Sequence, residues 1–168
     1  MKSWREAIRD GAVSGSVASL ISTITLGRCG RRESGAPYAP TNAISHWIWG
    51  DHAADHDEPS ARYTGIGYLI HHASSTWWAV FYEKWFGRVA ERGEAGQALA
   101  GGTAVAALAC FVDYRLTPHR LQPGFEKRLS TSSMFLVYAS FGFGLALRGL
   151  AASRLASNRP HPVAGWTR

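Results

Sequence analysis

Charged residues are scarce in this chain of 168 residues, and so are cysteines. Lys, Arg, Asp and Glu make up 18% of the sequence, against roughly 25% in an average soluble protein. The two cysteines, Cys29 and Cys110, exclude a disulfide-rich scaffold and a zinc site with four thiolates. The nucleophile elbow G-x-S-x-G, the P-loop and the metalloprotease motif HExxH are absent. We therefore predict no catalytic residues.

What the chain has instead is four long segments without a charged side chain, over residues 11–27, 63–82, 95–112 and 129–147. A helix rises about 1.5 Å per residue, so each segment can cross most of a hydrocarbon layer about 30 Å thick. We predict an all-α fold, a four-helix transmembrane bundle in one domain over residues 1–152, with spans at about 8–27, 61–86, 95–115 and 130–152. The alternative is a soluble protein with four buried helices, although soluble helices of this length normally carry a charged face.

Small residues recur at every fourth position in two of these spans. They are Gly11, Gly15 and Ser19 in the first span, and Ala98, Gly102 and Ala106 in the third. Residues four apart share one face of a helix, and small side chains let membrane helices approach closely. We predict that these residues form helix–helix contacts, either within the chain or with a second copy or partner.

The second span contains ionisable side chains that form a candidate intramembrane polar site. His71 and His72 lie near its middle, and His72, Thr76 and Glu83 share one face of the helix. Ionisable groups inside a membrane are costly and often functional, so a proton relay or a ligand site is one interpretation. The alternative is a neutral histidine that is hydrogen-bonded to a neighbouring helix.

Asp113 belongs to the same candidate site and lies two helical turns beyond Ala106 in the third span. The second and third spans are expected to run antiparallel, which brings Asp113 and Arg62 to the same membrane face and Glu83 to the opposite one. We expect the Asp113 carboxylate to pair with Arg62 or Arg115.

The connection after the first span holds a candidate interfacial helix and weak candidates for metal ligands. Thr41 and Asn42 offer a cap for a short helix over residues 43–50, which we expect to lie at the membrane interface. Imidazoles near carboxylates suit zinc or other divalent metals, and the candidate ligands are His46, His52, His56 and His119. A solvated polar loop is the alternative, and we predict no cofactor.

The distribution of basic residues favours one orientation in the membrane. With four spans, the N-terminus, the second connection and the C-terminus share a side and carry 10 of the 18 Lys and Arg residues. The positive-inside rule then favours cytoplasmic termini. Residues 153–168 are expected to be a flexible basic tail close to anionic lipid. Basic residues are spread along the chain without a cluster, so we expect no nucleic-acid partner.

Three motifs carry a resemblance to a known family. They are TNAISHWIWGD at residues 41–51, GYLIHHASSTWWAVFYE at 67–83 and FVDYRLTPHRLQPGFEKRLS at 111–130. The chain resembles, over about residues 28–147, a family of small bacterial inner-membrane proteins with four predicted transmembrane helices and no assigned activity. The resemblance implies a multi-pass protein of the bacterial inner membrane.

These patterns predict a non-enzymatic membrane component or accessory subunit. Its expected partners are the lipid bilayer and either a second copy of the chain or another membrane protein. One alternative is a small proton-linked transporter or channel that uses the histidine and glutamate stripe of the second span. The other alternative is a metal-binding membrane enzyme that uses the four candidate histidines.

Overall fold

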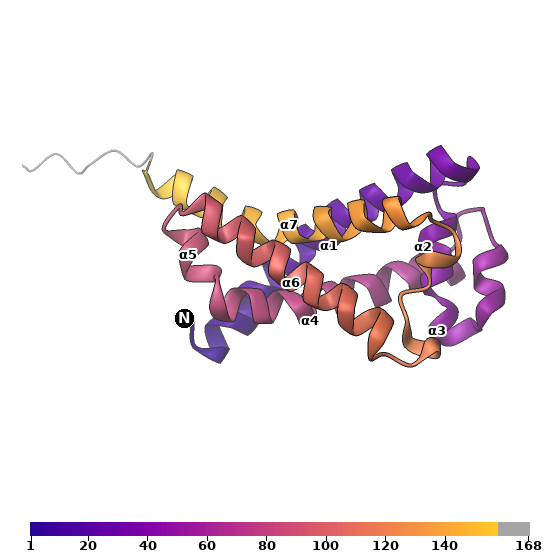
Figure 1. Cartoon of the computed structure of the whole chain (residues 1–168), viewed down its shortest axis with the longest axis horizontal. Coiled ribbons are helices and arrows are strands. Elements are labelled where there is room, and N and C mark those ends of the chain that lie inside the picture. Colours follow the sequence, from indigo (N-terminus) through magenta and orange to yellow (C-terminus); the bar gives the residue numbers. More distant parts are fainter. Residues whose placement is uncertain (158–168) are drawn as a thin grey trace, which may run out of the picture.

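The computed structural model describes residues 1–157, and within them the fold is all-helical, as predicted. Four long helices form an elongated bundle (Figure 1). They are α1 (Trp4–Ser34), α4 (Ile66–Trp85), α6 (Ala95–Arg115) and α7 (Thr131–Ser157). Helix α1 packs between α4 and α7, and α7 also packs on α6. Helices α4 and α6 also contact each other, and the Tyr82 hydroxyl of α4 donates to the Ala98 carbonyl of α6 at 3.2 Å.

Short helical elements fill the connections between the long helices. The first connection contains α2 (Ala39–Ile44), α3 (His46–Trp49), the 3-10 turn η1 (Asp51–Asp55) and the π-helical turn η2 (Ala61–Gly65). The second contains α5 (Gly87–Glu91), and the third contains η3 (His119–Leu121) and η4 (Phe125–Lys127). Figure 1 places the N-terminus, α5 and the end of α7 at one end of the bundle, and α2 and α3 at the other.

Local sequence signals set the two ends of α1. The Ser3 hydroxyl accepts a hydrogen bond from the Glu6 amide, and the Glu6 carboxylate accepts one from the Ser3 amide. This capping box satisfies amides at the start of the helix that have no partner within it. The helix ends at Gly35, which has φ of 73°, a left-handed conformation that glycine adopts without steric cost.

The small residues of the first and third spans lie at close contacts within the bundle. A Cβ atom on Gly15 would lie 2.5 Å from the Thr76 Cα, and one on Gly11 would lie 3.0 Å from the Val80 Cα, so both glycines face α4. A Cβ atom on Gly102 would lie 2.2 Å from the Gly142 carbonyl oxygen of α7. Ser19, Ala98 and Ala106 are buried as well.

Only part of the predicted membrane bundle is supported by hydropathy. Within residues 1–157, α6 and α7 are long and apolar enough to cross a membrane, with mean hydropathies of 1.6 and 1.5 over their most apolar segments. Helices α1 and α4 do not meet this criterion. The reason is that serine and histidine occupy part of their length, including the buried Ser14, Ser22 and Ser75. Hydropathy therefore supports two spans and leaves the four-span bundle unconfirmed.

Two predicted boundaries differ from the structure. The single short helix expected over residues 43–50 is two shorter helices, α2 and α3, which meet at Ser45. At the other end of the chain, α7 continues to Ser157 and so includes five residues assigned to the flexible tail. Its last turns keep regular helical geometry because Ala151, Ala152 and Leu155 are good helix formers. The rest of the predicted tail, 158–168, lies outside the described residues.

Candidate functional site

A cavity of about 450 Å³ opens between α4, α6 and α7 near the end formed by α2 and α3. We call it the α4–α6 cavity. Its wall is largely aromatic and aliphatic, and its polar side chains come from α4, α6 and the third connection. The aromatic lining consists of Trp47, Trp77, Trp78, Phe125, Tyr138 and Phe141. The polar lining consists of His71, Ser74, Ser75, Asp113 and Thr117. The cavity therefore combines an apolar body with a few polar groups, which is typical of small-molecule sites.

The Asp113 carboxylate is the acidic group of this cavity. The Tyr138 hydroxyl donates a hydrogen bond to its Oδ2 at 2.6 Å. No Lys, Arg or His side chain in the described part of the chain lies within 4.0 Å of it, so the predicted pairing with Arg62 or Arg115 is wrong. Tyr138 reaches Asp113 because α6 packs on α7. The Arg62 guanidinium instead lies 4.5 Å from the centre of the Trp49 ring.

His71 also lines the cavity, and its ring is held by α1. Its Nε2 lies 2.8 Å from the Ser22 hydroxyl, and that hydroxyl donates to the Ala18 carbonyl at 2.8 Å. Because the hydroxyl has one proton to donate, we assign the Nε2 of His71 as the donor in its bond with Ser22. In the neutral ring, Nδ1 is then an acceptor, and it has no hydrogen-bond partner in residues 1–157.

His72 and Thr76 lie outside the cavity. His72 Nδ1, Thr76 Oγ1, and the hydroxyls of Ser19 and Thr23 on α1 are buried polar atoms without a hydrogen-bond partner in the described chain. Glu83 lies near the opposite end of α4. The structure therefore brings His71 and Asp113 to one cavity and separates them from the other three residues of the predicted polar site.

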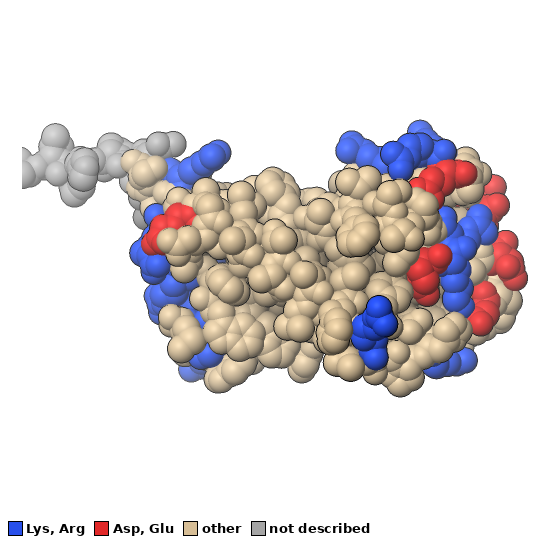
Figure 2. Space-filling view, viewed as in Figure 1, with Lys and Arg blue, Asp and Glu red and all other residues tan. Residues whose placement is uncertain are grey.

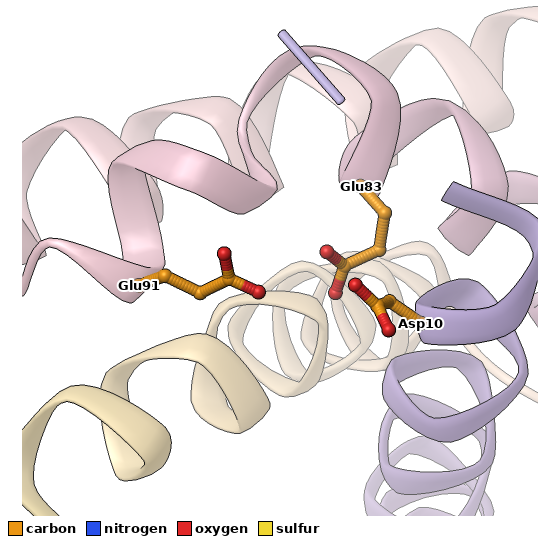
Figure 3. A group of neighbouring side chains, drawn as sticks. All are labelled: Asp10, Glu83 and Glu91. Atoms are coloured by element: carbon orange, nitrogen blue, oxygen red, sulfur yellow. The ribbon is translucent and has the colours of Figure 1, made fainter. Parts of the chain in front are cut away.

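Glu83 belongs to a group of buried charges, the ionic cluster, at the N-terminal end of the bundle. Figure 3 shows its three carboxylates, Asp10 from α1, Glu83 from α4 and Glu91 from α5, pointing toward one another. The Lys2 ammonium donates to Asp10 at 2.8 Å and to Glu83 and Glu91 at 2.6 Å each. Although three carboxylates this close could hold a metal ion, the Lys2 ammonium already neutralises part of their charge.

Arg148 from α7 completes the ionic cluster. Its guanidinium lies 3.1 Å from Asp10, 3.4 Å from Glu83 and 3.3 Å from Glu91. The Lys2 and Glu83 side chains are only 2% and 1% exposed. Gly87 permits this crowding, because a Cβ atom there would lie 2.2 Å from the Glu83 carboxylate. The cluster joins the N-terminus to α1, α4, α5 and α7.

The four candidate metal ligands form two separate pairs. The His46 and His119 ring centroids are 6.5 Å apart, and so are those of His52 and His56. His46 is buried, and its Nε2 lies 2.8 Å from the Gln122 carbonyl oxygen. Within residues 1–157, the one group of acidic, histidine or cysteine side chains with metal-like spacing is the carboxylate group of the ionic cluster.

Sequence reasoning missed most of the ionic cluster and the role of Tyr138. Lys2, Asp10 and Arg148 flank uncharged segments, which indicates membrane boundaries but not which charges will meet. The signal that could have pointed to Tyr138 is its place near the middle of the fourth uncharged segment, where a buried tyrosine hydroxyl needs a hydrogen-bond partner. Comparison of the chain with protein-family models, curated proteins and solved structures finds no match.

Proposed function

We propose that the chain is a four-span integral membrane protein of a bacterial inner membrane and acts as a non-enzymatic binding component or accessory subunit. The observation that carries this proposal is the inverted polarity of α1 and α4. Four serines and two carboxylates of these helices are buried in the interior, and large apolar side chains face outward; the buried residues are Ser14, Ser19, Ser22, Ser75, Asp10 and Glu83. Soluble proteins place these residue types the other way round.

The outer faces of α1 and α4 carry the large apolar side chains of this inverted arrangement. Val13, Leu20 and Ile24 of α1 are more than half exposed, and so are Leu69 and Trp77 of α4. A bilayer would cover these side chains, and the inward-facing serines would be shielded from lipid. The low hydropathy of α1 and α4 is thus compatible with four spans.

The arrangement of charge supports the same proposal. In Figure 2 the middle of the visible face is largely free of Lys, Arg, Asp and Glu, and these residues gather mainly at the two ends of the bundle. Exposed apolar residues of α6 and α7, including Leu108, Phe111, Phe135 and Phe143, continue the uncharged belt. Such a belt between charged ends is expected for a protein that crosses a bilayer. The proposed orientation has both termini in the cytoplasm.

The role of a binding component rests on the α4–α6 cavity. The small residues that could have bound a partner, such as Gly15 and Gly102, are instead occupied by contacts between helices of this chain. A partner or ligand would therefore bind at the cavity or at the exposed outer faces, where a second copy of the chain or another membrane protein could also pack.

The proposal is tested by expressing the full chain in a bacterium and washing its membranes with alkaline carbonate. A protein with four spans stays in the pellet and is released only by detergent. A protein that enters the supernatant without detergent, as a compact soluble monomer, would contradict the proposal.

A second candidate function is a small proton-linked transporter. It is favoured by one observation, that His71 and Asp113 line the same cavity. In proteoliposomes that contain a pH-sensitive dye, an imposed potential should drive proton entry that is lost in His71→Asn. His72→Asn is the matched control, because His72 lies outside the cavity. Equal flux through all three proteins would exclude the candidate.

The third function considered, a metal-dependent membrane enzyme, has less support because the two histidine pairs are not brought together as one site. Metal analysis of the detergent-purified protein tests it, and a substoichiometric metal content would end it.

A further inference from the structure

We infer that the α4–α6 cavity binds an organic monocation with an apolar body, such as a primary amine that carries an aromatic or alkyl group. This inference rests on the proposed function of a membrane protein with a ligand cavity. It adds the chemical class of the ligand, which follows from the charge, the hydrogen-bonding character and the shape of the lining.

The lining carries one negative group, the Asp113 carboxylate, which has no cationic partner in the described residues. Asp113 has no basic side chain within 4.0 Å in the described residues, and its second carboxylate oxygen has no hydrogen-bond partner there. A carboxylate in apolar surroundings is costly unless it is paired. A cationic ligand would provide the missing charge, whereas a neutral lipid chain would leave the carboxylate unpaired.

Two polar groups of the lining have free capacity to accept a hydrogen bond. The free Asp113 oxygen and His71 Nδ1 both accept, and the Thr117 hydroxyl already donates to the Val112 carbonyl. An ammonium group offers up to three donors and no acceptor. It therefore complements these two groups better than a carboxylate or phosphate ligand, whose negative charge would meet the Asp113 carboxylate.

The aromatic wall favours the same class of ligand. Trp47, Trp77 and Trp78 line the cavity. Tryptophan is the aromatic side chain that attracts cations most strongly through the face of its ring, and it also packs against apolar groups. The carboxylate and the indole rings can together bind the cationic group, and the indole rings can also pack against the apolar body.

Size and access are suitable for a small amphiphile. The cavity volume of about 450 Å³ lies within the usual range for small-molecule sites, roughly 300–1,000 Å³. Its lining includes Trp77, which is 63% exposed, and Leu121, which is 45% exposed, so the cavity reaches the molecular surface. A ligand with an apolar body could enter there from the bilayer.

The test uses two probes of similar size that differ in charge, 4-phenylbutylamine and 4-phenylbutanol. Calorimetric titration of the full chain in detergent should show that the amine binds and that the alcohol binds at least about tenfold more weakly. Asp113→Asn should reduce amine affinity by about tenfold or more and leave alcohol affinity unchanged. The asparagine keeps an oxygen that can accept the Tyr138 hydrogen bond, so the bundle is expected to fold.

Two further variants serve as controls. Asp55→Asn removes an equal charge from an exposed site outside the cavity and should bind the amine as the wild type does. Ala73→Phe fills the cavity from α4 and should weaken binding of both probes. The inference is overturned if amine and alcohol bind equally, if neither binds, or if Asp113→Asn has no effect. Carbonate extraction of the same variants shows whether the four-span proposal fails separately.

Discussion

At the scale of single residues, the ionic cluster is the most unusual feature, because charged side chains are rarely buried together. Lys2 contacts three carboxylates, and Arg148 approaches the same three. Arg9 adds a further contact to Asp10 from the rim, at 2.9 Å. Three carboxylates and three basic groups balance in charge. Burial of the carboxylates is tolerable only while the two basic groups inside the cluster, Lys2 and Arg148, are present.

We predict that Lys2→Met strongly destabilises the protein. The methionine keeps the length of the side chain but leaves the carboxylates without their central cation, and breaking a buried ion pair in this way costs about 3–5 kcal/mol. Denaturation in mixed detergent micelles measures the free energy of unfolding.

Arg9→Met is the matched control, because the Arg9 side chain is 75% exposed although it contacts the same Asp10. It should leave the free energy of unfolding unchanged. Equal stability losses in the two variants would show that the buried position of Lys2 has no special importance.

At the scale of elements, α1 makes the two most extensive helix–helix contacts of the bundle, with α4 and with α7. It contacts α4 through glycines on one side, and its last turn contacts the start of α7 on another. Glu33 accepts hydrogen bonds from the Ser130 amide, the Ser130 hydroxyl and the Ser133 hydroxyl. One carboxylate at the end of α1 thus satisfies donors at the first turn of α7, where a negative charge is also favoured by the helix dipole.

Gly15→Ala is predicted to weaken the contact between α1 and α4. The new Cβ atom would lie 2.5 Å from the Thr76 Cα, and backbone cannot move aside as a flexible side chain can. Overpacking of this kind costs about 1–3 kcal/mol. Gly96→Ala in α6 is the control, since nothing lies within 4 Å of its added Cβ. The same micelle denaturation compares the two, and a Gly15→Ala protein as stable as Gly96→Ala would contradict the close approach.

The Glu33 contacts predict a pH dependence. Hydrogen bonds from Ser133 and Ser130 lower the pKa of Glu33 from 4.5 to about 2. A carboxyl with a lowered pKa in the folded state contributes stability above its unfolded pKa, and this contribution is lost as the pH falls from about 4.5 toward about 2.

Glu33→Gln should therefore be less stable than the wild type at pH 6, and the difference should shrink by pH 2.5. Thermal unfolding of both proteins at the two pH values measures this difference. A difference that stays constant with pH would mean that the Glu33 charge does not bond to α7.

At the scale of the whole molecule, the two ends are chemically distinct. One end holds the ionic cluster, where buried and partly buried charges from the N-terminus and four helices meet. The other end contains the polar residues of the first and third connections, with ion pairs such as Lys127–Asp51 and Arg128–Asp57 at partly exposed positions. The uncharged belt lies between them (Figure 2). In the proposed topology, the ends lie on opposite sides of a membrane.

Thiol labelling can test this topology. In a background with Cys29→Ala and Cys110→Ala, one cysteine is introduced at a time, at the exposed positions Arg5 or Asp55. For cytoplasmic termini, an impermeant maleimide should label Asp55→Cys in intact spheroplasts and Arg5→Cys in inverted vesicles. The reverse pattern would keep four spans but invert the orientation. Labelling of both positions from one side would contradict a membrane span in α1 between them.

The sequence by itself determined the helices and the helix faces that carry small residues, because both depend on local periodicity. Uncharged segments mark where α6 and α7 lie, and four-residue spacing placed Gly11 and Gly15 on one face of α1. The tertiary structure alone decided which polar groups meet. Lys2 and Glu83 are 81 positions apart, and Tyr138 is 25 positions from Asp113. Such contacts depend on how far each helix is shifted and rotated against its neighbour, which the pattern of a single helix does not encode.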